Sequence, residues 1–549
     1  MSVTPRLVVV LSVLLSSAFA GADPYLVFFK DQKVFEHVST QVRLSRSGTL
    51  NSTLSFQNLE SPAIVSDELK HLKALIIDSD SFIDLQTISQ ESSIAWVESE
   101  IVRPAPRPFR GGAFSQAFSS RTLSIDPPPQ PWGIKAVKAP GAWAQGARGQ
   151  NVKVAVLDTG VDREHPALKA NFLQGKDFIG ESGGAYEFFD ADGHGSHVAG
   201  TILGGQLASG FVGVAPQARL LAGKVCSLSG CPNIAVAKGI DWAIATGADV
   251  VNLSLGGDFL TNGEALALKA AEQVGVVVVA ATGNDGVPKV GFPAALETSI
   301  AVGAVDVNLK KADFSQWGPE LDVMAPGVDV VSSVPQKTGR EMEVSFNLNG
   351  RVLRAPSQMM AGSNDAEQSL QGSLVNGGIG KPEELQKAAG KLVLIARGGG
   401  LSFKDKARNA IIAGATAVVV ANNEPGLFPG SVTDDGSKVS VPVILVEQNT
   451  GATLKAAMDR REVVSASLKT VATDYSSLDG TSMATPHVTG VVALLLSVRP
   501  DLTPAQVRSL IKQTASSLQS GGHVGRLDPQ TGAGLVNAEK LVTEGLAIR

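Results

Sequence analysis

The feature that most constrains the fold is a series of short apolar runs that alternate with helical stretches. The runs have the length and composition of strands buried on both faces, and they lie at 152–157, 220–225, 250–255 and 274–280. Between them, residues 234–246 and 263–273 show helical spacing. Strands that alternate with helices predict an α/β fold with a doubly wound parallel sheet.

The first of these predicted strands ends in a candidate catalytic residue, Asp158, within Asp158-Thr159-Gly160. Functional sites in open α/β sheets form at the carboxyl ends of strands, which favours this position. The same tripeptide occurs in aspartic peptidases, but these need a second carboxylate to share a proton. The chain has no second Asp-Thr-Gly or Asp-Ser-Gly, so that chemistry is excluded.

A histidine flanked by glycines is the second candidate. His194 lies in Asp-Gly-His-Gly-Ser-His-Val-Ala-Gly, and the glycines would let a general base approach its partners closely. The alternative is a metal site, because His194 and His197 are three residues apart on a predicted helix. No glutamate follows the first histidine as in helical zinc motifs, which argues against a metal.

The third candidate is Ser482, in Gly-Thr-Ser-Met-Ala-Thr-Pro-His before the apolar run 488–496. A serine at the start of a helix lies beside free N–H groups and partial positive charge, which favour an oxyanion. Pro486 is tolerated there because it lies near the helix start. A helix-capping serine is the plainer alternative, and it weakens once the Asp and His runs are counted.

An asparagine follows a further predicted strand, in Ala281-Thr-Gly-Asn284-Asp-Gly. The Asn284 amide is suited to donate a hydrogen bond to a developing oxyanion, with the Ser482 backbone N–H as second donor. The alternative is a turn residue, since Asn-Asp-Gly is favourable turn chemistry.

Together these runs resemble the subtilisin family of serine peptidases, in which the order along the chain is also Asp, His, Ser. The resemblance spans about residues 132–537, apart from an insertion. It implies that Ser482 attacks the scissile carbonyl, that His194 acts as general base and acid, and that Asp158 orients the imidazole. It also implies a substrate-binding edge at Ser254, Leu255, Gly256 and Gly257, with Gly283 on the wall of the first specificity pocket.

The flanking segments also have family counterparts. We expect a subtilisin-like peptidase domain at 132–336 and 473–549, with an inserted protease-associated (PA) domain at 337–472. Residues 21–104 resemble an inhibitor-type, ferredoxin-like α+β propeptide, in which 25–29, 49–56 and 94–97 read as strands and 34–44 and 66–75 as helices. Residues 105–131, rich in proline and arginine, read as an exposed linker that carries the maturation cleavage.

Residues 1–20 have the features of a signal peptide, with Arg6, an apolar run and Ala18-Phe19-Ala20. A membrane anchor is the alternative, but the apolar run is short for a span. The net charge of −5 is spread along the chain, which indicates no nucleic-acid partner. We therefore expect a secreted, monomeric zymogen that acts on polypeptides and is inhibited by its own propeptide, with no membrane partner.

Cys226 and Cys231 are the only cysteines, and in an oxidising compartment they can form one disulfide. Free thiols are the alternative, and a zinc site would need more ligands nearby. In the insertion, the resemblance rests on 397–403 and the helical stretch to 413, where Leu401 stands in place of a frequent cysteine. The glycines at 398–400 precede that helix without the Gly-Lys-Ser/Thr of a phosphate loop.

No cofactor or metal is predicted. Many subtilisins bind calcium tightly through an Asp and an Asn, and the matching positions here are Ala167 and Leu207, which cannot ligate the ion. Asn51 lies in a glycosylation sequon of the expected propeptide, whereas the sequon at Asn252 falls in a predicted core strand.

The specificity pocket has no clearly placed acidic residue, Asp285 being the nearest, so broad specificity with an apolar residue before the cleaved bond is expected. The competing hypothesis is a catalytically silent binding protein that uses the insertion. It is disfavoured because the chain keeps all three catalytic candidates and Asn284.

Overall fold

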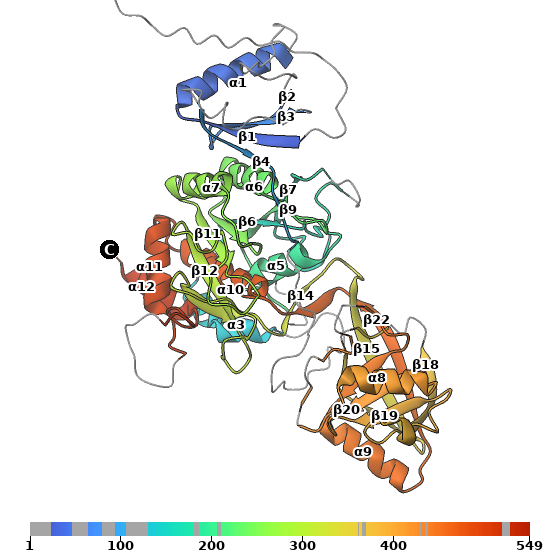
Figure 1. Ribbon diagram of the computed structural model, residues 1–549. Helices are drawn as coiled ribbons and strands as arrows, with labels where there is room; N and C mark the ends of the chain where they lie inside the picture. The colour runs from blue at the N-terminus through green and yellow to red at the C-terminus, as the bar shows by residue number, and fades with distance from the viewer. Residues whose placement is uncertain are drawn as a thin grey trace, which may run out of the picture.

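The computed structural model describes residues 23–46, 64–79, 94–105, 130–180, 186–205, 210–360, 362–364, 369–424, 426–427, 430–433, 437–518 and 528–548. These residues form a central α/β unit, an N-terminal α+β unit above it and an inserted unit at its side (Figure 1). The predicted signal peptide, most of the linker, Asn51 and Leu207 lie outside the described residues.

The central unit is built on a seven-stranded parallel sheet in the order β13-β12-β11-β10-β6-β8-β7. Its strands are β6 (Lys153–Asp158), β7 (Phe172–Asp177), β8 (Arg219–Lys224), β10 (Val250–Leu253), β11 (Val277–Ala281), β12 (Ser299–Val305) and β13 (Val323–Pro326). The parallel α/β sheet predicted from the apolar runs is confirmed, and β6, β8, β10 and β11 match those runs within three residues at each end.

The two faces of this sheet pack against different helices, because alternate side chains of a strand point to opposite sides. Val154 and Val156 of β6 pack with α5 (His194–Leu203) and α10 (Thr481–Leu496), whereas Ala155 and Leu157 pack with α6 (Asn233–Ala245) and α7 (Asn262–Gln273). All sixteen residues of α10 are buried, as expected for an apolar helix against the middle of a sheet. The remaining helices of this unit are α3 (Trp132–Ala136), α4 (Ala139–Ala144), α11 (Pro504–Thr514) and α12 (Ala538–Ala547).

The N-terminal unit is a four-stranded antiparallel sheet in the order β2-β3-β1-β4, with α1 (Gln32–Arg46) on one face. The strands are β1 (Asp23–Phe29), β2 (Ile64–Leu69), β3 (Ala74–Ser79) and β4 (Ile94–Ser99). The other face, with Leu26 and Phe28, joins the apolar core formed by α6 and α7. The N-terminal unit therefore packs directly on the central unit through apolar side chains.

The sequence prediction of a helix at 66–75 is wrong. These residues belong to β2 and β3 and to the turn between them, where Lys73 takes the left-handed backbone conformation with a φ of 52°. Glu, Leu, Lys and Ala favour helix locally, but pairing with β1 and burial of Leu69 and Leu75 outweigh that preference. The expected strand at 49–56 lies outside the described residues.

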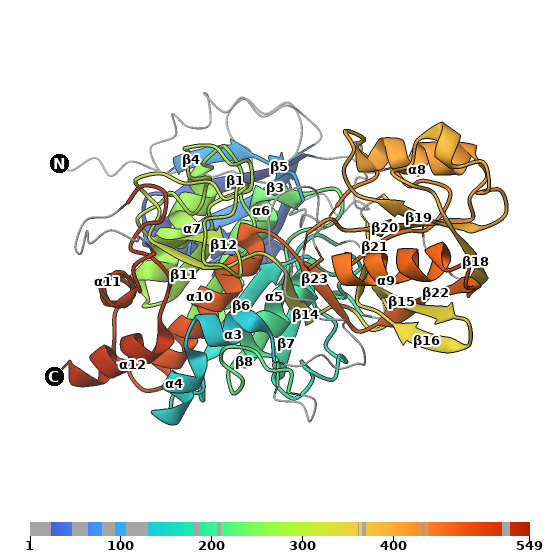
Figure 2. The ribbon, with the colours of Figure 1, turned by 90° about the horizontal axis from the view of Figure 1, so that it is seen from below.

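The inserted unit leaves and rejoins the central unit through two paired strands, β14 (Val330–Ser333) and β23 (Tyr475–Leu478). It contains an eight-stranded sheet in the order β16-β15-β22-β18-β19-β20-β21-β17. Figure 2 shows this unit beside the central one, with α8 and α9 at its sheet. Its elements are β15 (Gly339–Leu348), β16 (Arg351–Arg354), β17 (Ser357–Met359), β18 (Leu370–Asn376), β19 (Leu392–Ala396), α8 (Phe403–Ile412), β20 (Ala417–Ala421), β21 (Val443–Val446), α9 (Gln448–Asp459) and β22 (Val464–Thr473).

Two short strands connect the N-terminal and central units. β5 (Val102–Arg103) follows the N-terminal unit and pairs antiparallel with β9 (Cys231–Pro232) of the central unit. Among the described residues, no helix is long and apolar enough to cross a bilayer.

Candidate active site

The sheet and helix α5 bring Asp158 and His194 together. Asp158 is the last residue of β6 and His194 is the first of α5, and the His194 Nδ1 lies 2.7 Å from the Asp158 Oδ1. Both side chains are fully buried. Gly195 makes the approach feasible, because a Cβ there would lie 2.0 Å from the Gly160 carbonyl oxygen and 3.2 Å from the Asp158 Cβ.

The charge around His194 favours its protonated form. Burial alone would lower the pKa of the imidazole, but the Asp158 carboxylate, with smaller contributions from Asp192 and Asp190, raises the pKa above its ordinary value. The ring therefore lies where a positive charge formed by proton uptake would be stabilised, as general-base catalysis requires.

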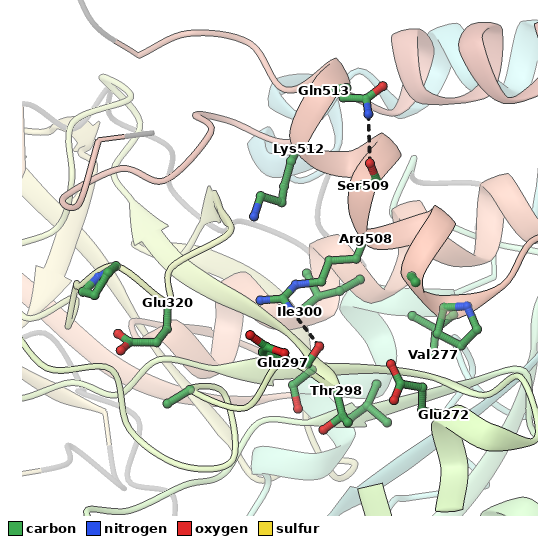
Figure 3. Close-up of a pocket in the computed structure, with 16 residues that line it drawn as sticks. Glu272, Val277, Glu297, Thr298, Ile300, Glu320, Arg508, Ser509, Lys512 and Gln513 are labelled. Atoms are coloured by element: carbon green, nitrogen blue, oxygen red, sulfur yellow. Dashed lines mark hydrogen bonds between the residues drawn. The ribbon is translucent and has the colours of Figure 1, made fainter. Parts of the chain in front are cut away.

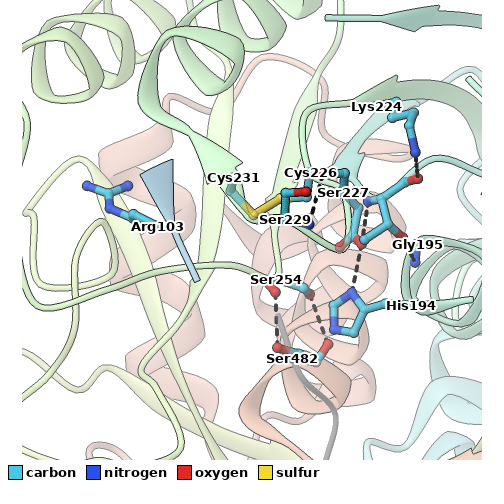
Figure 4. Close-up of a disulfide and its surroundings, with 12 residues drawn as sticks. Arg103, His194, Gly195, Lys224, Cys226, Ser227, Ser229, Cys231, Ser254 and Ser482 are labelled. Atoms are coloured by element: carbon cyan, nitrogen blue, oxygen red, sulfur yellow. Dashed lines mark hydrogen bonds and ion pairs between the residues drawn. A yellow bond between two sulfur atoms is a disulfide. The ribbon is translucent and has the colours of Figure 1, made fainter. Parts of the chain in front are cut away.

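Ser482 lies in the first turn of α10, beside His194 (Figure 4). Its hydroxyl donates a hydrogen bond to the Ser254 carbonyl oxygen at 3.0 Å, and the Ser254 hydroxyl donates to the Ser482 carbonyl oxygen at 2.9 Å. The His194 Nε2 is buried without a hydrogen-bond partner among the described residues. The arrangement leaves one ring nitrogen available for the serine hydroxyl.

Asn284 is held so that its amide nitrogen is left for another partner. Its Oδ1 accepts hydrogen bonds from the backbone N–H of Thr481 at 2.8 Å and from the Thr481 hydroxyl at 2.9 Å. A Cβ at Gly480 would lie 3.5 Å from the Asn284 Nδ2 and 3.6 Å from the Ser482 backbone nitrogen. The two nitrogens therefore border one space that a glycine keeps open, which is the geometry of a two-donor oxyanion site.

The residues expected to bind substrate form a rigid edge next to Ser482. Gly257 exchanges two backbone hydrogen bonds with Phe292, at 2.9 and 2.8 Å, and Leu255 is buried. Gly283 has a φ of 109°, and a Cβ there would lie 1.8 Å from the Gln316 Oε1, so a side chain would not fit.

Asn252 supports this edge from within the core. It is completely buried in β10, donates to the Ser254 hydroxyl at 3.0 Å and accepts from Thr489 of α10 at 2.7 Å. From the sequence, Asn252 was recognised only as part of a sequon, and this supporting role was not predicted. Because the sequon asparagine is in a buried strand, it does not offer an exposed glycosylation site.

Cys226 and Cys231 are joined by a disulfide, and the described residues contain no free cysteine. The bridge closes the loop that carries β9, the partner of β5. The covalent link therefore restrains β9, the strand that pairs with β5.

The metal alternatives find no support in the geometry. Burial lowers the pKa of His197 to about 3, and its Nε2 lies 2.8 Å from the Val330 carbonyl oxygen. No group of three or more His, Cys, Asp or Glu residues suited to a metal is found among the described residues. Ala167, where many subtilisins have a calcium ligand, packs in an apolar cluster with Phe211 and Tyr475, which does not fit a calcium ion.

A surface pocket lies away from these residues, between α11 and the sheet. Its lining includes Val277 and Ser299, which begin β11 and β12. Figure 3 shows Arg508 crossing the pocket to the Glu297 backbone, with which it forms a hydrogen bond of 2.6 Å. Because the catalytic candidates lie at the opposite, carboxyl ends of the strands, this pocket is separate from the site.

Two further residues of the site were not predicted from the sequence. Thr481 orients Asn284, and Glu264 forms a buried ion pair with Arg103 of β5. Thr481 immediately precedes Ser482, so its position in the motif was a usable signal. The Arg103–Glu264 pair joins residues 161 positions apart, and no local sequence pattern predicts it.

A family of known proteins matches most of this chain. The Subtilase family matches residues 149–363 and 361–534. Subtilisin DY of Bacillus licheniformis is 43% identical over 231 residues, covering 41% of this chain and 80% of the relative. An alkaline protease of Alkalihalobacillus alcalophilus is 34% identical over 352 residues, covering 63% and 83%.

A solved structure of the psychrophilic subtilisin-like protease Apa1, from the Antarctic psychrotroph Pseudoalteromonas sp. AS-11, superposes with a TM-score of 0.58 at 30% identity. The match covers 75% of this chain and 97% of that one. The chain therefore belongs to the subtilase family, and it is a serine-type endopeptidase.

Proposed function

We propose that the chain is a secreted subtilase, made as a self-processing zymogen, that cleaves peptide bonds with Ser482, His194 and Asp158 through an acyl-enzyme intermediate. The observation that carries the proposal is the 2.7 Å contact between His194 Nδ1 and Asp158 Oδ1, with Nε2, which has no hydrogen-bond partner within the described part of the chain, beside Ser482. Polypeptides are the substrates, and no cofactor takes part.

In the proposed reaction the Ser482 hydroxyl turns from the Ser254 carbonyl oxygen to the His194 Nε2. As Ser482 Oγ bonds to the scissile carbonyl carbon, Nε2 takes the hydroxyl proton and then transfers it to the leaving amine. Water then attacks the acyl carbon while Nε2 takes its proton, and Nε2 returns that proton to Ser482 Oγ as the bond between Oγ and the acyl carbon breaks and the acid product leaves. Asp158 holds the Nδ1–H and stabilises the imidazolium at each transfer.

The negative charge on the carbonyl oxygen is stabilised by Asn284 Nδ2 and the Ser482 backbone N–H. Both border the space left by Gly480, and the Ser482 N–H lies in the first turn of α10, where backbone donors lack intrahelical partners. Because Thr481 occupies the Asn284 oxygen, the amide presents its NH₂ group to the substrate.

The N-terminal unit acts as the inhibitory propeptide in this proposal. It packs on α6 and α7. The backbone N–H of His71 in this unit also donates a hydrogen bond of 2.8 Å to the Asp241 side chain of α6. Ile101 exchanges two hydrogen bonds with Asn233, and β5 then occupies the edge of β9. A substrate strand needs the same edge, so the unit blocks it until it is released.

Self-processing is tested by comparing the precursor with its Ser482→Ala variant. We expect the wild type to be shortened to a product that begins within residues 105–131, because its own serine cuts the linker. The variant should remain at full precursor length after signal removal. Intact mass and N-terminal sequencing measure both.

A serine-directed fluorophosphonate gives an independent readout of the same proposal, with Ser497→Ala as a control serine from the end of α10. Labelling of wild type and control, but not of Ser482→Ala, is expected. An intact wild-type precursor that also fails to label would contradict the proposal.

The pH profile follows from the environment of His194. The base must be neutral to accept a proton, and its pKa is raised above 6.5, so kcat/KM should rise with pH to a half-maximum above pH 6.5. Asp192 contributes to the raised pKa, so Asp192→Asn should move the half-maximum to lower pH without abolishing activity. A shift in the opposite direction would refute the assignment of His194 as the base.

A further inference from the structure

The segment after the N-terminal unit places one arginine in a buried pocket beside the substrate edge. Arg103 is opposite Cys231 in the pairing of β5 with β9, and its side chain leaves on the side away from the disulfide (Figure 4). It is only 4% exposed. Its two terminal guanidinium nitrogens each contact one carboxylate oxygen of Glu264, which is the geometry of a bidentate ion pair.

The pocket around this arginine is built by the central unit. Glu264, in the first turn of α7, is 1% exposed, and its Oε2 accepts the Thr261 hydroxyl at 2.9 Å. The Phe259 carbonyl oxygen accepts from the Arg103 Nη2 at 2.7 Å. A Cβ at Gly257 would lie 3.1 Å from the Arg103 Cδ, so the glycine leaves room for the arginine stem. These groups offer a shaped anionic site to a guanidinium.

Helix capping explains Thr261 but not the direction of the Glu264 carboxylate. In a capping box the glutamate bonds back to the backbone N–H of the capping residue. α11 has this reciprocal pair in Thr503 and Gln506. In α7 only the Thr261 half is present, and the carboxylate faces the Thr261 hydroxyl and Arg103 instead.

The position of the pocket relative to Ser482 can be estimated from the edge strand. The Ser254 carbonyl oxygen contacts the Ser482 hydroxyl, and Gly257, three residues further on, contacts Arg103. An extended chain advances about 3.3 Å per residue, so Arg103 lies about three residues from the nucleophile. A substrate strand that takes the place of β5 would put its third or fourth residue before the cleaved bond in this pocket.

We propose that Glu264 selects a substrate with a basic side chain, arginine above lysine, at the third or fourth residue before the cleaved bond. The inference rests on the proposed function, because it takes Ser482 as the residue that cuts this strand. Among the described residues, Arg103 is the cation within 4.0 Å of Glu264, and release of the N-terminal unit removes it. The released carboxylate keeps the Thr261 hydroxyl but has no cation, and the planar fork of a substrate arginine restores both guanidinium contacts.

The test uses mature enzyme recovered from the full-length precursor and a panel of internally quenched peptides. Each peptide has an apolar residue before the cleaved bond, and one arginine, lysine, leucine or glutamate is placed in turn at the second to fifth residue before it. Mass spectrometry verifies the cleaved bond. We expect kcat/KM to be at least about tenfold higher for arginine than for leucine at the third or fourth residue only, with glutamate lowest.

The variant Glu264→Gln should remove the arginine preference while retaining hydrolysis of the leucine peptides. Because that change also weakens a contact in the precursor, the double change Arg103→Leu with Glu264→Leu is made as well, replacing the pair by apolar groups. That enzyme should prefer leucine at the same residue. Glu272→Gln, a glutamate in the last turn of the same helix, is the matched control and should keep the wild-type preference.

Equal hydrolysis of arginine and leucine peptides by wild type, or an undiminished preference in Glu264→Gln, would overturn the inference while leaving the serine peptidase mechanism intact. Failure of every peptide, together with absent fluorophosphonate labelling of Ser482, would overturn the proposed mechanism and the inference with it. The two failures are therefore distinguishable.

Discussion

Replacing Asp158 by Asn is expected to lower kcat by about 10⁴-fold, the scale known for the equivalent carboxylate of serine peptidases. The Asp158 charge stabilises the imidazolium that forms when His194 takes the serine proton, and it raises the His194 pKa. An amide of the same size keeps the shape of the site but removes the charge and permits the wrong tautomer of the ring.

Steady-state hydrolysis of a peptide measures this loss, with kcat and KM determined separately. The effect should fall on kcat, because Asp158 is buried and does not touch the substrate edge. Asp177→Asn, at the last residue of the parallel strand β7 and two strands away from β6, is the matched control. Its half-buried side chain accepts a hydrogen bond from the Ile179 N–H, which an amide oxygen can also accept, so activity should stay within about threefold. A kcat loss below tenfold in Asp158→Asn, with the variant folded, would refute its role.

Replacing Asn284 is expected to produce the second largest loss, about 10²–10³-fold in kcat, as known for the oxyanion-hole asparagine of a subtilisin. Two variants distinguish the loss of the hydrogen-bond donor from an effect on folding. Asn284→Ala removes the donor and also leaves Thr481 without its acceptor, whereas Asn284→Asp keeps an oxygen for Thr481 and replaces the donor by a second carboxylate oxygen. Both should lose kcat, and Asn284→Asp should also bring an unfavourable charge near the oxyanion.

Gly480→Ala tests the oxyanion space between Asn284 and the Ser482 backbone by filling it with a methyl group. The added methyl group would lie 3.5 Å from Asn284 Nδ2 and 3.6 Å from the Ser482 nitrogen, where the carbonyl oxygen must enter. Its kcat should also fall, while Asn308→Ala, an exposed asparagine after the parallel strand β12, should behave as wild type. Thermal unfolding of each variant checks that the loss is catalytic. Full kcat in both Asn284 variants would exclude the amide as an oxyanion donor.

The periodicity of the sequence predicted the central sheet well because buried parallel strands are uniformly apolar. The run 250–255, for example, became β10, and 263–273 became α7 with a shift of one residue at its start. The prediction failed at 66–75, where helix-favouring residues are held as two strands because β2 pairs with β3 and β3 pairs with β1. The helix preference of these residues contributes less to stability than the burial of one face of the two strands against α6 and α7.

The sequence by itself determined the family and the candidate residues Asp158, His194 and Ser482, because each lies in a glycine-rich run whose chemistry is local. Only the tertiary structure decided which atoms meet. It directed the Asn284 oxygen to Thr481, and it joined Arg103 to Glu264 across 161 positions. The physical reason is that backbone periodicity depends on near neighbours, whereas the direction of a buried polar group depends on partners that packing brings from far along the chain.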